Sequence, residues 1–120
     1  MTMDFMKDRP IYLQLVEMIC GNVIKGDLKP GDKLPSVREF AIDSGVNVNT
    51  VQRVYKELEL MELTETKRGQ GTFVTTDIEV IRAMREQMKE QVAMQFVSSI
   101  ESLGFSVDEI IDVLKKKRGE

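Results

Sequence analysis

Apolar residues recur at helical spacing in five stretches of this chain, and residues that favour helix ends separate those stretches. The first predicted helix has Pro10 in its first turn and runs to about Lys25, with Gly26 as its stop. Its apolar side chains spread around more than one face, which predicts burial on two sides. One side can pack on the neighbouring helices. The other side needs a second partner, and the C-terminal segment is the available one.

Residues 33–60 predict two short helices joined by a tight turn. Ser36 and Glu39 have the spacing of a capping box, in which each side chain bonds the backbone N–H of the other residue. Gly45 can end that helix in a left-handed conformation, and Asn47 can cap the next one. The apolar face of this next helix consists of Val51, Val54, Leu58 and Met61. Two helices separated by about three residues predict a helix-turn-helix.

The second of these helices carries its charges unevenly. It has no acidic residue between Val46 and Lys56, and its glutamates lie at the far end. Because acidic residues at a helix C-terminus oppose the helix dipole, this layout favours an anionic partner at the N-terminal half. The side chains that point away from the apolar face are Asn49, Thr50, Gln52, Arg53 and Lys56. Asn, Gln and Arg side chains match base edges in the major groove of DNA. In isolation such a helix would be interpreted as a solvated surface helix, but its place in a helix-turn-helix favours a recognition helix.

A hairpin with a basic tip is predicted after the recognition helix. Residues 63–66 and 72–74 are rich in Thr and in β-branched or aromatic residues, and residues 67–71 between them contain glycines. A basic turn alone is usually a solvated turn, but one that directly follows a helix-turn-helix is better interpreted as a wing. Arg68 and the backbone of residues 69–71 would then approach phosphates or a minor groove.

The C-terminal segment differs in character. Thr76 and Glu79 predict a capping box at the start of a long helix that Gly104 ends, and Ser106 with Glu109 caps a last helix. The apolar residues at helical spacing along the long helix are Ile78, Ile81, Met84, Met88, Val92, Phe96, Ile100 and Leu103. A single helix cannot bury this face on itself, so we interpret the face as a core or dimer surface rather than a ligand site.

Together these elements predict a mainly α (α+β) fold: a winged helix-turn-helix with a two-helix C-terminal dimerisation extension. We expect residues 1–76 to form the DNA-binding domain and residues 77–120 to form a helical dimerisation tail. The tail alone is too short to enclose a pocket of roughly 300–1,000 Å³. A site for an unknown small-molecule effector would therefore have to lie between the tail and the winged helix, or between subunits.

Composition narrows the class of function. The chain has no His and one cysteine, Cys20, so neither a zinc site nor a Ser-His or Cys-His catalytic group can be assembled. We therefore expect no enzyme, no catalytic residues, no metal and no cofactor. No apolar run approaches the ~20 residues of a transmembrane helix, and the N-terminus lacks a signal peptide's apolar core, so we expect a cytoplasmic protein without membrane contact. The net charge of −3 means that any DNA contact must come from a local patch.

Four motifs of the chain resemble the GntR family of bacterial transcription regulators. They are PIYLQL, GDLKPGDKLPSVREFA, GVNVNTVQRVYKELE and RGQGTFV, in order across residues 10–74. The two-helix tail is similar to that of the YtrA-like subfamily, which uses it for dimerisation. The resemblance implies a homodimer that binds a palindromic operator in double-stranded DNA sequence-specifically, generally as a repressor. By the same resemblance the DNA-contact positions are Ser36, Arg38, Asn47, Asn49, Thr50, Arg53, Arg68 and Gly69.

Two positions depart from the family's pattern. Glu62 stands where Gly commonly ends the recognition helix, so either Glu62 takes a left-handed conformation at a cost of ~1 kcal/mol or the helix ends differently. Val48 stands where Pro is common, and both suit the first helical position. The alternative function is a winged-helix protein–protein interaction module without DNA binding, which the acidic net charge permits. Specific DNA binding would instead weaken steeply as salt rises.

Overall fold

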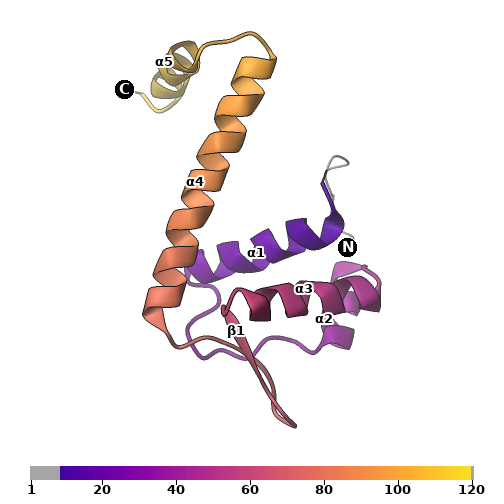
Figure 1. Cartoon of the computed structure of the whole chain (residues 1–120). Helices are drawn as coiled ribbons and strands as arrows, with labels where there is room; N and C mark the ends of the chain where they lie inside the picture. Colours follow the sequence, from indigo (N-terminus) through magenta and orange to yellow (C-terminus); the bar gives the residue numbers. More distant parts are fainter. Residues whose placement is uncertain (1–8, 120) are drawn as a thin grey trace. The chain divides into compact units, whose positions relative to one another are not determined.

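The computed structural model describes residues 9–119 of the 120-residue chain (Figure 1). Its elements are α1 (Ile11–Lys25), α2 (Val37–Ser44), α3 (Val48–Leu60), β1 (Thr64–Lys67), β2 (Gly71–Val74), α4 (Ile78–Ser102) and α5 (Val107–Lys117). They form two compact units that divide within α4, between Arg85 and Glu86. The mainly helical fold, with a winged helix-turn-helix followed by two further helices, is confirmed. The functional division at residue 76 stays a prediction.

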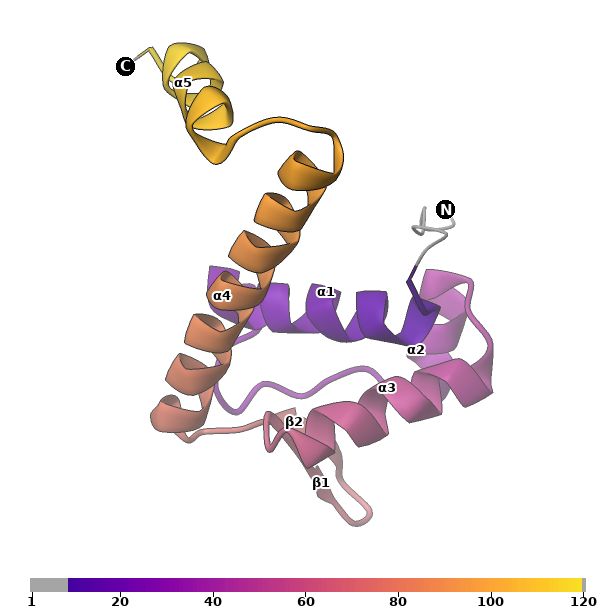
Figure 2. The ribbon, with the colours of Figure 1, turned by 45° about the horizontal axis from the view of Figure 1, so that its top comes forward.

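Helix α3 lies at the centre of the first unit, since α1, α2 and β1 all contact it. Figure 2 shows α1 along one side of α3 and α2 near the start of α3. The packing is apolar, and its fully buried side chains include Leu15, Ile19, Val51, Val54 and Leu58. Burying one side chain of this kind stabilises the fold by ~1.5–3 kcal/mol, so the apolar face of α3 holds the unit together. Val51, Val54 and Leu58 are buried as the helical spacing predicts, whereas Met61 is the half-buried C-cap residue that follows the helix.

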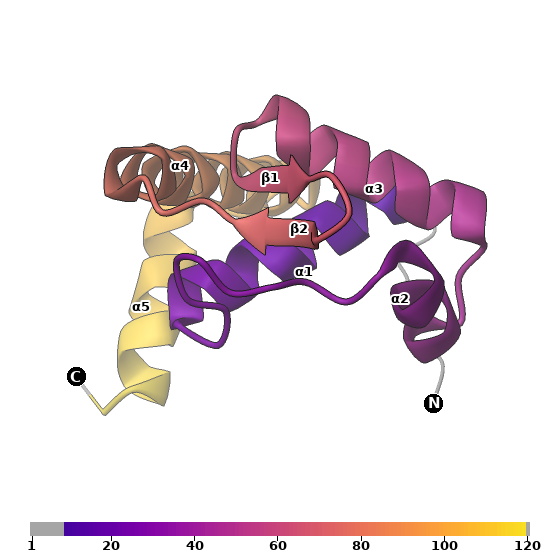
Figure 3. The same cartoon turned by 90° about the horizontal axis from the view of Figure 1, so that it is seen from below.

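The loop before α2 pairs with strand β2 of the hairpin, on the edge of β2 that does not face β1. Strands β1 and β2 pair antiparallel, with Lys67 opposite Gly71 next to the tip. Lys33 forms a bridge with Phe73 on the other side of β2, and Leu34 beside it is 3% exposed. Figure 3 shows this loop running past the hairpin. Residues far apart in the sequence therefore meet at the base of the wing.

The end of α3 shows how the chain leaves the recognition helix. Glu62 has a φ of 64°, and its N–H donates to the Glu59 carbonyl at 2.9 Å. The Leu63 N–H donates to the Leu58 carbonyl at 3.0 Å. These two bonds are the pair that defines a Schellman motif, in which the residue after the C-cap is left-handed. The first of the two predicted endings is thus confirmed: Glu62 takes the conformation that Gly adopts without a steric cost.

The start of α4 differs from the prediction. The predicted capping box between Thr76 and Glu79 is wrong, because α4 begins at Ile78 and the Glu79 N–H donates to Oδ1 of Asp77 at 3.0 Å. Asp77 is held in turn by Thr75, whose hydroxyl oxygen accepts the Asp77 N–H at 3.1 Å. Asp is a more favourable N-cap than Thr, and here it lies directly before the first helical residue.

The other helix ends follow the local sequence signals closely. Capping boxes begin α2 and α5 as predicted. Gly26, Gly45 and Gly104 follow their helices with positive φ, which confirms three predicted stops. Pro10 lies at the N-cap of α1, directly before the helix rather than in its first turn. There its missing N–H costs no helical hydrogen bond.

The second unit consists of the rest of α4 and α5. No residue of α5 is buried. Large apolar side chains with more than a third of their surface exposed are Val92, Met94, Phe96, Leu103, Phe105, Ile111, Val113 and Leu114. Among residues 9–119, no helix has both the length and the apolar character needed to cross a membrane.

Candidate nucleic-acid interface

The first group of predicted contacts lies at the start of α2. The Ser36 hydroxyl oxygen accepts the Glu39 N–H at 3.1 Å, and the Glu39 carboxylate accepts the Ser36 N–H at 3.0 Å. Hydrogen bonds to the carboxylate from Ser36, first from its backbone N–H and then from its side chain, hold the pKa of Glu39 below its ordinary value. Arg38 in the first turn is exposed. The exposed Ser36 hydroxyl and the Arg38 guanidinium are both groups that can contact a phosphate oxygen.

Tyr55 fixes this end of α2 against the recognition helix. Its hydroxyl donates to the Pro35 carbonyl at 2.6 Å, and its ring meets Phe40 edge to face with the ring centres 5.9 Å apart. Burial, with a smaller contribution from the charge of Glu39, raises the pKa of Tyr55 to about 12, so the hydroxyl remains a donor at neutral pH. The recognition helix is thus joined to the start of α2 by a partly buried hydrogen bond and to α2 itself by aromatic packing.

The second group begins at the N-cap of α3. The side-chain oxygen of Asn47 accepts the Asn49 N–H at 2.7 Å, which confirms Asn47 as the cap. The Asn47 amide nitrogen can still donate to an anion at this positive end of the helix dipole. Asn49 is exposed, and within the described part of the chain no hydrogen bond engages its side chain. Its amide group can therefore pair with a base edge through both the oxygen and the nitrogen.

Asn49, Thr50 and Arg53 come together around one hollow of about 360 Å³. The other wall of the hollow is the start of α1, with Ile11 and Tyr12. The guanidinium carbon of Arg53 lies 3.7 Å from the centre of the Tyr12 ring, which is a cation–π contact. Sequence reasoning did not single out Tyr12 as a site residue. No local signal marks it, because its partner lies on a different element.

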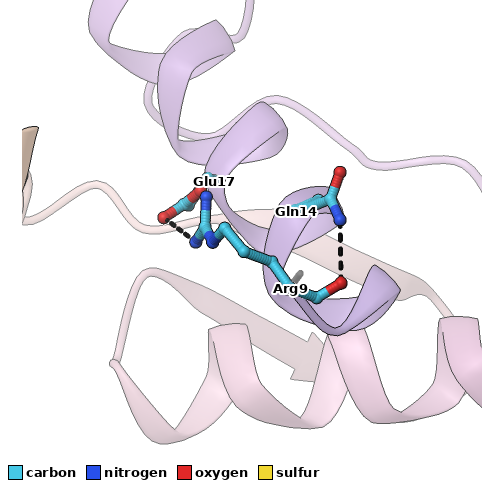
Figure 4. Close-up of polar contacts among 3 residues, drawn as sticks. All are labelled: Arg9, Gln14 and Glu17. Carbon is cyan, nitrogen blue, oxygen red and sulfur yellow. Dashed lines mark hydrogen bonds and ion pairs between the residues drawn. The ribbon is translucent and has the colours of Figure 1, made fainter. Parts of the chain in front are cut away.

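Polar contacts around Arg9 hold the start of α1 in place (Figure 4). The Arg9 guanidinium pairs with the Glu17 carboxylate at 2.6 Å, and the Gln14 side-chain amide donates to the Arg9 carbonyl at 3.0 Å. Both side chains of the ion pair are mostly shielded from solvent, which reduces the screening of their attraction. The turn that leads into Ile11 and Tyr12 is therefore tied to the body of α1.

The third group is the tip of the β1–β2 hairpin, where Arg68 and Gly69 are exposed. Gly69 has a φ of 76°, so the turn needs a residue that tolerates a left-handed backbone. The structure adds Lys33, which sequence reasoning missed. Its side chain lies so close to Gly71 that an added Cβ there would be 2.7 Å from Lys33 Cε. The sequence around Lys33 gives no sign of this contact, because the contact depends on pairing with β2.

The candidate residues thus form three groups rather than one pocket. Across residues 9–119, no hydrogen bond joins the hairpin tip to α2 or α3. Separate groups suit a long ligand such as a DNA duplex, whose backbone and base edges are contacted at different points. The same part of the chain holds no group of three or more His, Cys, Asp or Glu residues arranged to bind a metal ion.

Comparison with known proteins shows which protein family the chain belongs to. Residues 11–74 match the family described as bacterial regulatory proteins, gntR family. The chain belongs to the GntR family. This GntR regulator is 40% identical over 111 residues to the HTH-type transcriptional regulator YhcF of Bacillus subtilis (strain 168), with 92% of each chain covered. It is 36% identical to the HTH-type transcriptional repressor YtrA of the same organism, over 89% of this chain and 83% of YtrA.

Solved structures agree with this assignment. A GntR family transcriptional regulator from Listeria monocytogenes matches with a TM-score of 0.81 and 38% identity, over 93% of this chain and 98% of that one. The DNA-binding domain of AraR in complex with the operator ORX1 matches with a TM-score of 0.55 and 26% identity, over 62% of this chain and 93% of that one. The protein is therefore a transcription regulator of the YtrA type with a DNA-binding domain, and it is not an enzyme. None of these relatives supports the alternative of a module without DNA binding.

Proposed function

We propose that this GntR regulator is a cytoplasmic repressor that binds a palindromic operator as a homodimer. In each half-site α3 enters the major groove by its N-terminus, while the start of α2 and the hairpin tip contact the backbone. The residues proposed for the groove are Asn47, Asn49, Thr50 and Arg53. The residues proposed for the backbone are Ser36, Arg38, Arg68 and Gly69.

The exposed apolar surface of the second unit supports the proposal that the protein is a homodimer. Phe96 is 44% exposed, Leu103 is 73% exposed and Phe105 is 49% exposed. A helix such as α5, in which no residue is buried, is only marginally stable in water, since helices in proteins depend on packing of an apolar face. A second copy of the chain supplies the same apolar face around a twofold axis, which is the commonest symmetry of soluble oligomers.

Affinity gives a second reason for two subunits. One DNA-binding module of this size covers only about 600–1,000 Å² of protein surface on DNA. Linking two modules makes the second contact effectively intramolecular, with a gain on the order of 10²–10⁴ in overall affinity. A twofold dimer requires two half-sites related by the same symmetry, hence a palindromic operator. Repression as the sign of regulation is supported by the relative YtrA, which is named a repressor.

The experiment that tests the proposal is truncation of the chain after Arg85. The first turns of α4 belong to the first unit, and Met84 within them is 6% exposed, so this cut keeps that unit complete. We expect a monomer by light scattering. Its affinity for a half-site should match that of the intact chain on the same half-site, while its affinity for the full palindrome should fall by about 10²–10⁴. A monomer that still binds the full palindrome as tightly as the intact chain would refute the proposed role of the tail.

A full-length pair of variants tests the same point without truncation. Phe96→Glu combined with Leu103→Glu puts two charges on the exposed apolar surface of the second unit and should lower the mass from dimer to monomer. Ile42→Glu is the control, because Ile42 on α2 is 74% exposed, close to the exposure of Leu103, and lies in the first unit. The control should leave the mass unchanged. Dimers of equal stability in both variants would contradict a dimer interface on this surface.

A further inference from the structure

Arg53 is held by an aromatic ring rather than by a carboxylate. Its guanidinium carbon lies 3.7 Å from the centre of the Tyr12 ring. In the part of the chain that the structure describes, no acidic side chain forms an ion pair with Arg53. Arg53 is exposed on the polar side of α3. The Tyr12 ring is thus the group that restrains this long side chain.

The kind of restraint matters for what the guanidinium can still bind. An ion pair would use guanidinium N–H donors and offset the positive charge, whereas stacking on a ring face does neither. The N–H donors lie in the guanidinium plane and point outward from its edges. They therefore remain available for two parallel hydrogen bonds to O6 and N7 of guanine, the commonest specific contact of arginine in the major groove.

The position of Tyr12 is itself fixed. Later residues of α1, such as Leu15 and Ile19, are 0% and 2% exposed in the core against α3. The ion pair and hydrogen bond at Arg9 hold the entry to the helix. Next to the stacked pair the hollow of about 360 Å³ leaves room for a base edge to approach. A free arginine side chain would lose rotamer freedom on binding, and this pre-ordering reduces that loss.

We propose that Tyr12 is a positioning residue for base recognition: its ring orders Arg53 and so sets how strongly the protein prefers guanine at one position of each half-site. This inference rests on the proposed function, in which Arg53 reads a base. It assigns a role to the first helix, which otherwise serves as packing for α3. It also predicts that the ring, not the hydroxyl, is the part of Tyr12 that matters for sequence preference.

The test compares four full-length variants on one operator and its single-base substitutions. The operator is selected from a random DNA library by the intact protein. The measured quantity is the preference ratio, the affinity for the selected operator divided by the affinity for the operator substituted at the position that responds to Arg53→Ala. Tyr12→Leu should lower this ratio about two- to fivefold, the range of an exposed cation–π contact. Tyr12→Phe should keep the ratio, and Tyr12→Leu added to Arg53→Ala should change it no further.

Each other outcome has a definite meaning. If Arg53→Ala removes the preference but Tyr12→Leu leaves it intact, the inference is wrong and the proposed function stands. If Tyr12→Leu lowers the ratio equally with and without Arg53, or if Tyr12→Phe lowers it as much as Tyr12→Leu, Tyr12 does not act through ring stacking and the inference fails. If Arg53→Ala changes no base preference at all, the proposed recognition face is wrong, and the inference is overturned with it.

Discussion

Replacing Glu62 with Gly should stabilise the first unit, because Glu62 holds a φ of 64° at the end of α3. A left-handed backbone costs an L-residue about 1–2 kcal/mol, and Gly avoids that cost. The greater freedom of Gly in the unfolded chain offsets about 0.5–1 kcal/mol of this gain. We therefore expect a net change of about 0–1.5 kcal/mol in the free energy of unfolding from the backbone alone, centred on an increase of about 0.75 kcal/mol.

The charge of Glu62 must be separated from its backbone. A carboxylate at the negative end of a helix dipole costs ~0.3–1 kcal/mol, so Glu62→Gly relieves two costs at once. Glu62→Gln removes the charge and keeps the Cβ, and the difference between the two variants isolates the backbone term. Urea unfolding of both variants at the same protein concentration measures this difference, since the stability of an oligomer depends on concentration. A Gly variant no more stable than the Gln variant would show that the strain of the left-handed position does not exceed the entropic cost of Gly.

Two further predictions concern buried hydroxyls. Thr64 and Thr75 are 2% and 3% exposed; Thr64 Oγ1 has no hydrogen-bond partner among the described residues, whereas Thr75 Oγ1 accepts the Asp77 N–H. Thr64→Val should therefore raise the free energy of unfolding by ~1 kcal/mol, and Thr75→Val should lower it by ~1–2 kcal/mol. Urea unfolding measures both changes. Because the pKa of Tyr55 is raised from 10.0 to about 12 in the folded chain, its contribution to stability is complete below pH 10 and is lost as pH rises toward about 12. Unfolding measured across this pH range should show the loss in the intact chain and a smaller one in Tyr55→Phe.

The helices were predictable from sequence because their ends are set by local hydrogen bonds. Ser36 with Glu39, Asn47, and Gly45 act on backbone groups within a few residues, so their spacing alone fixes where α2 and α3 begin and where α2 ends. The start of α4 was missed because two good caps stand side by side. The hydrogen bond from the Asp77 N–H to Thr75 selects Asp77, and spacing does not reveal it.

The candidate site was predictable only in part. Polar residues on the outer face of α3 follow from helical periodicity, and the hollow then brings Asn49, Thr50 and Arg53 together as that spacing implies. Tyr12 and Lys33 could not be found this way, because each acts through a partner that only the fold brings near. The contact roles of the predicted residues remain predictions, since they depend on DNA.

The salt dependence of operator binding should be limited by the number of basic residues on the proposed DNA-binding surface. The exposed basic residues on α2, α3, the hairpin and residues 33–36 directly before α2 are Lys33, Arg38, Arg53, Lys56, Lys67 and Arg68. If Arg53 reads a base, at most five of these contact phosphates in each subunit. A dimer then releases counterions from at most about ten phosphates, so the slope of log K against log salt should be no steeper than about −9.

Substitution of Lys33 tests this limit on the salt dependence. The Lys33 side chain lies against Gly71 next to the tip of the wing, so Lys33→Ala should make the slope shallower by about 2 in a dimer, one phosphate for each subunit. Because a phosphate contact carries no sequence information, the ratio of affinities for the operator and its single-base variants should not change. Lys89→Ala is the control, since Lys89 lies on α4 in the second unit and pairs with Glu86 at 2.8 Å. An unchanged slope for Lys33→Ala would remove Lys33 from the interface, whereas a changed base preference would make it a reading residue instead of a backbone contact.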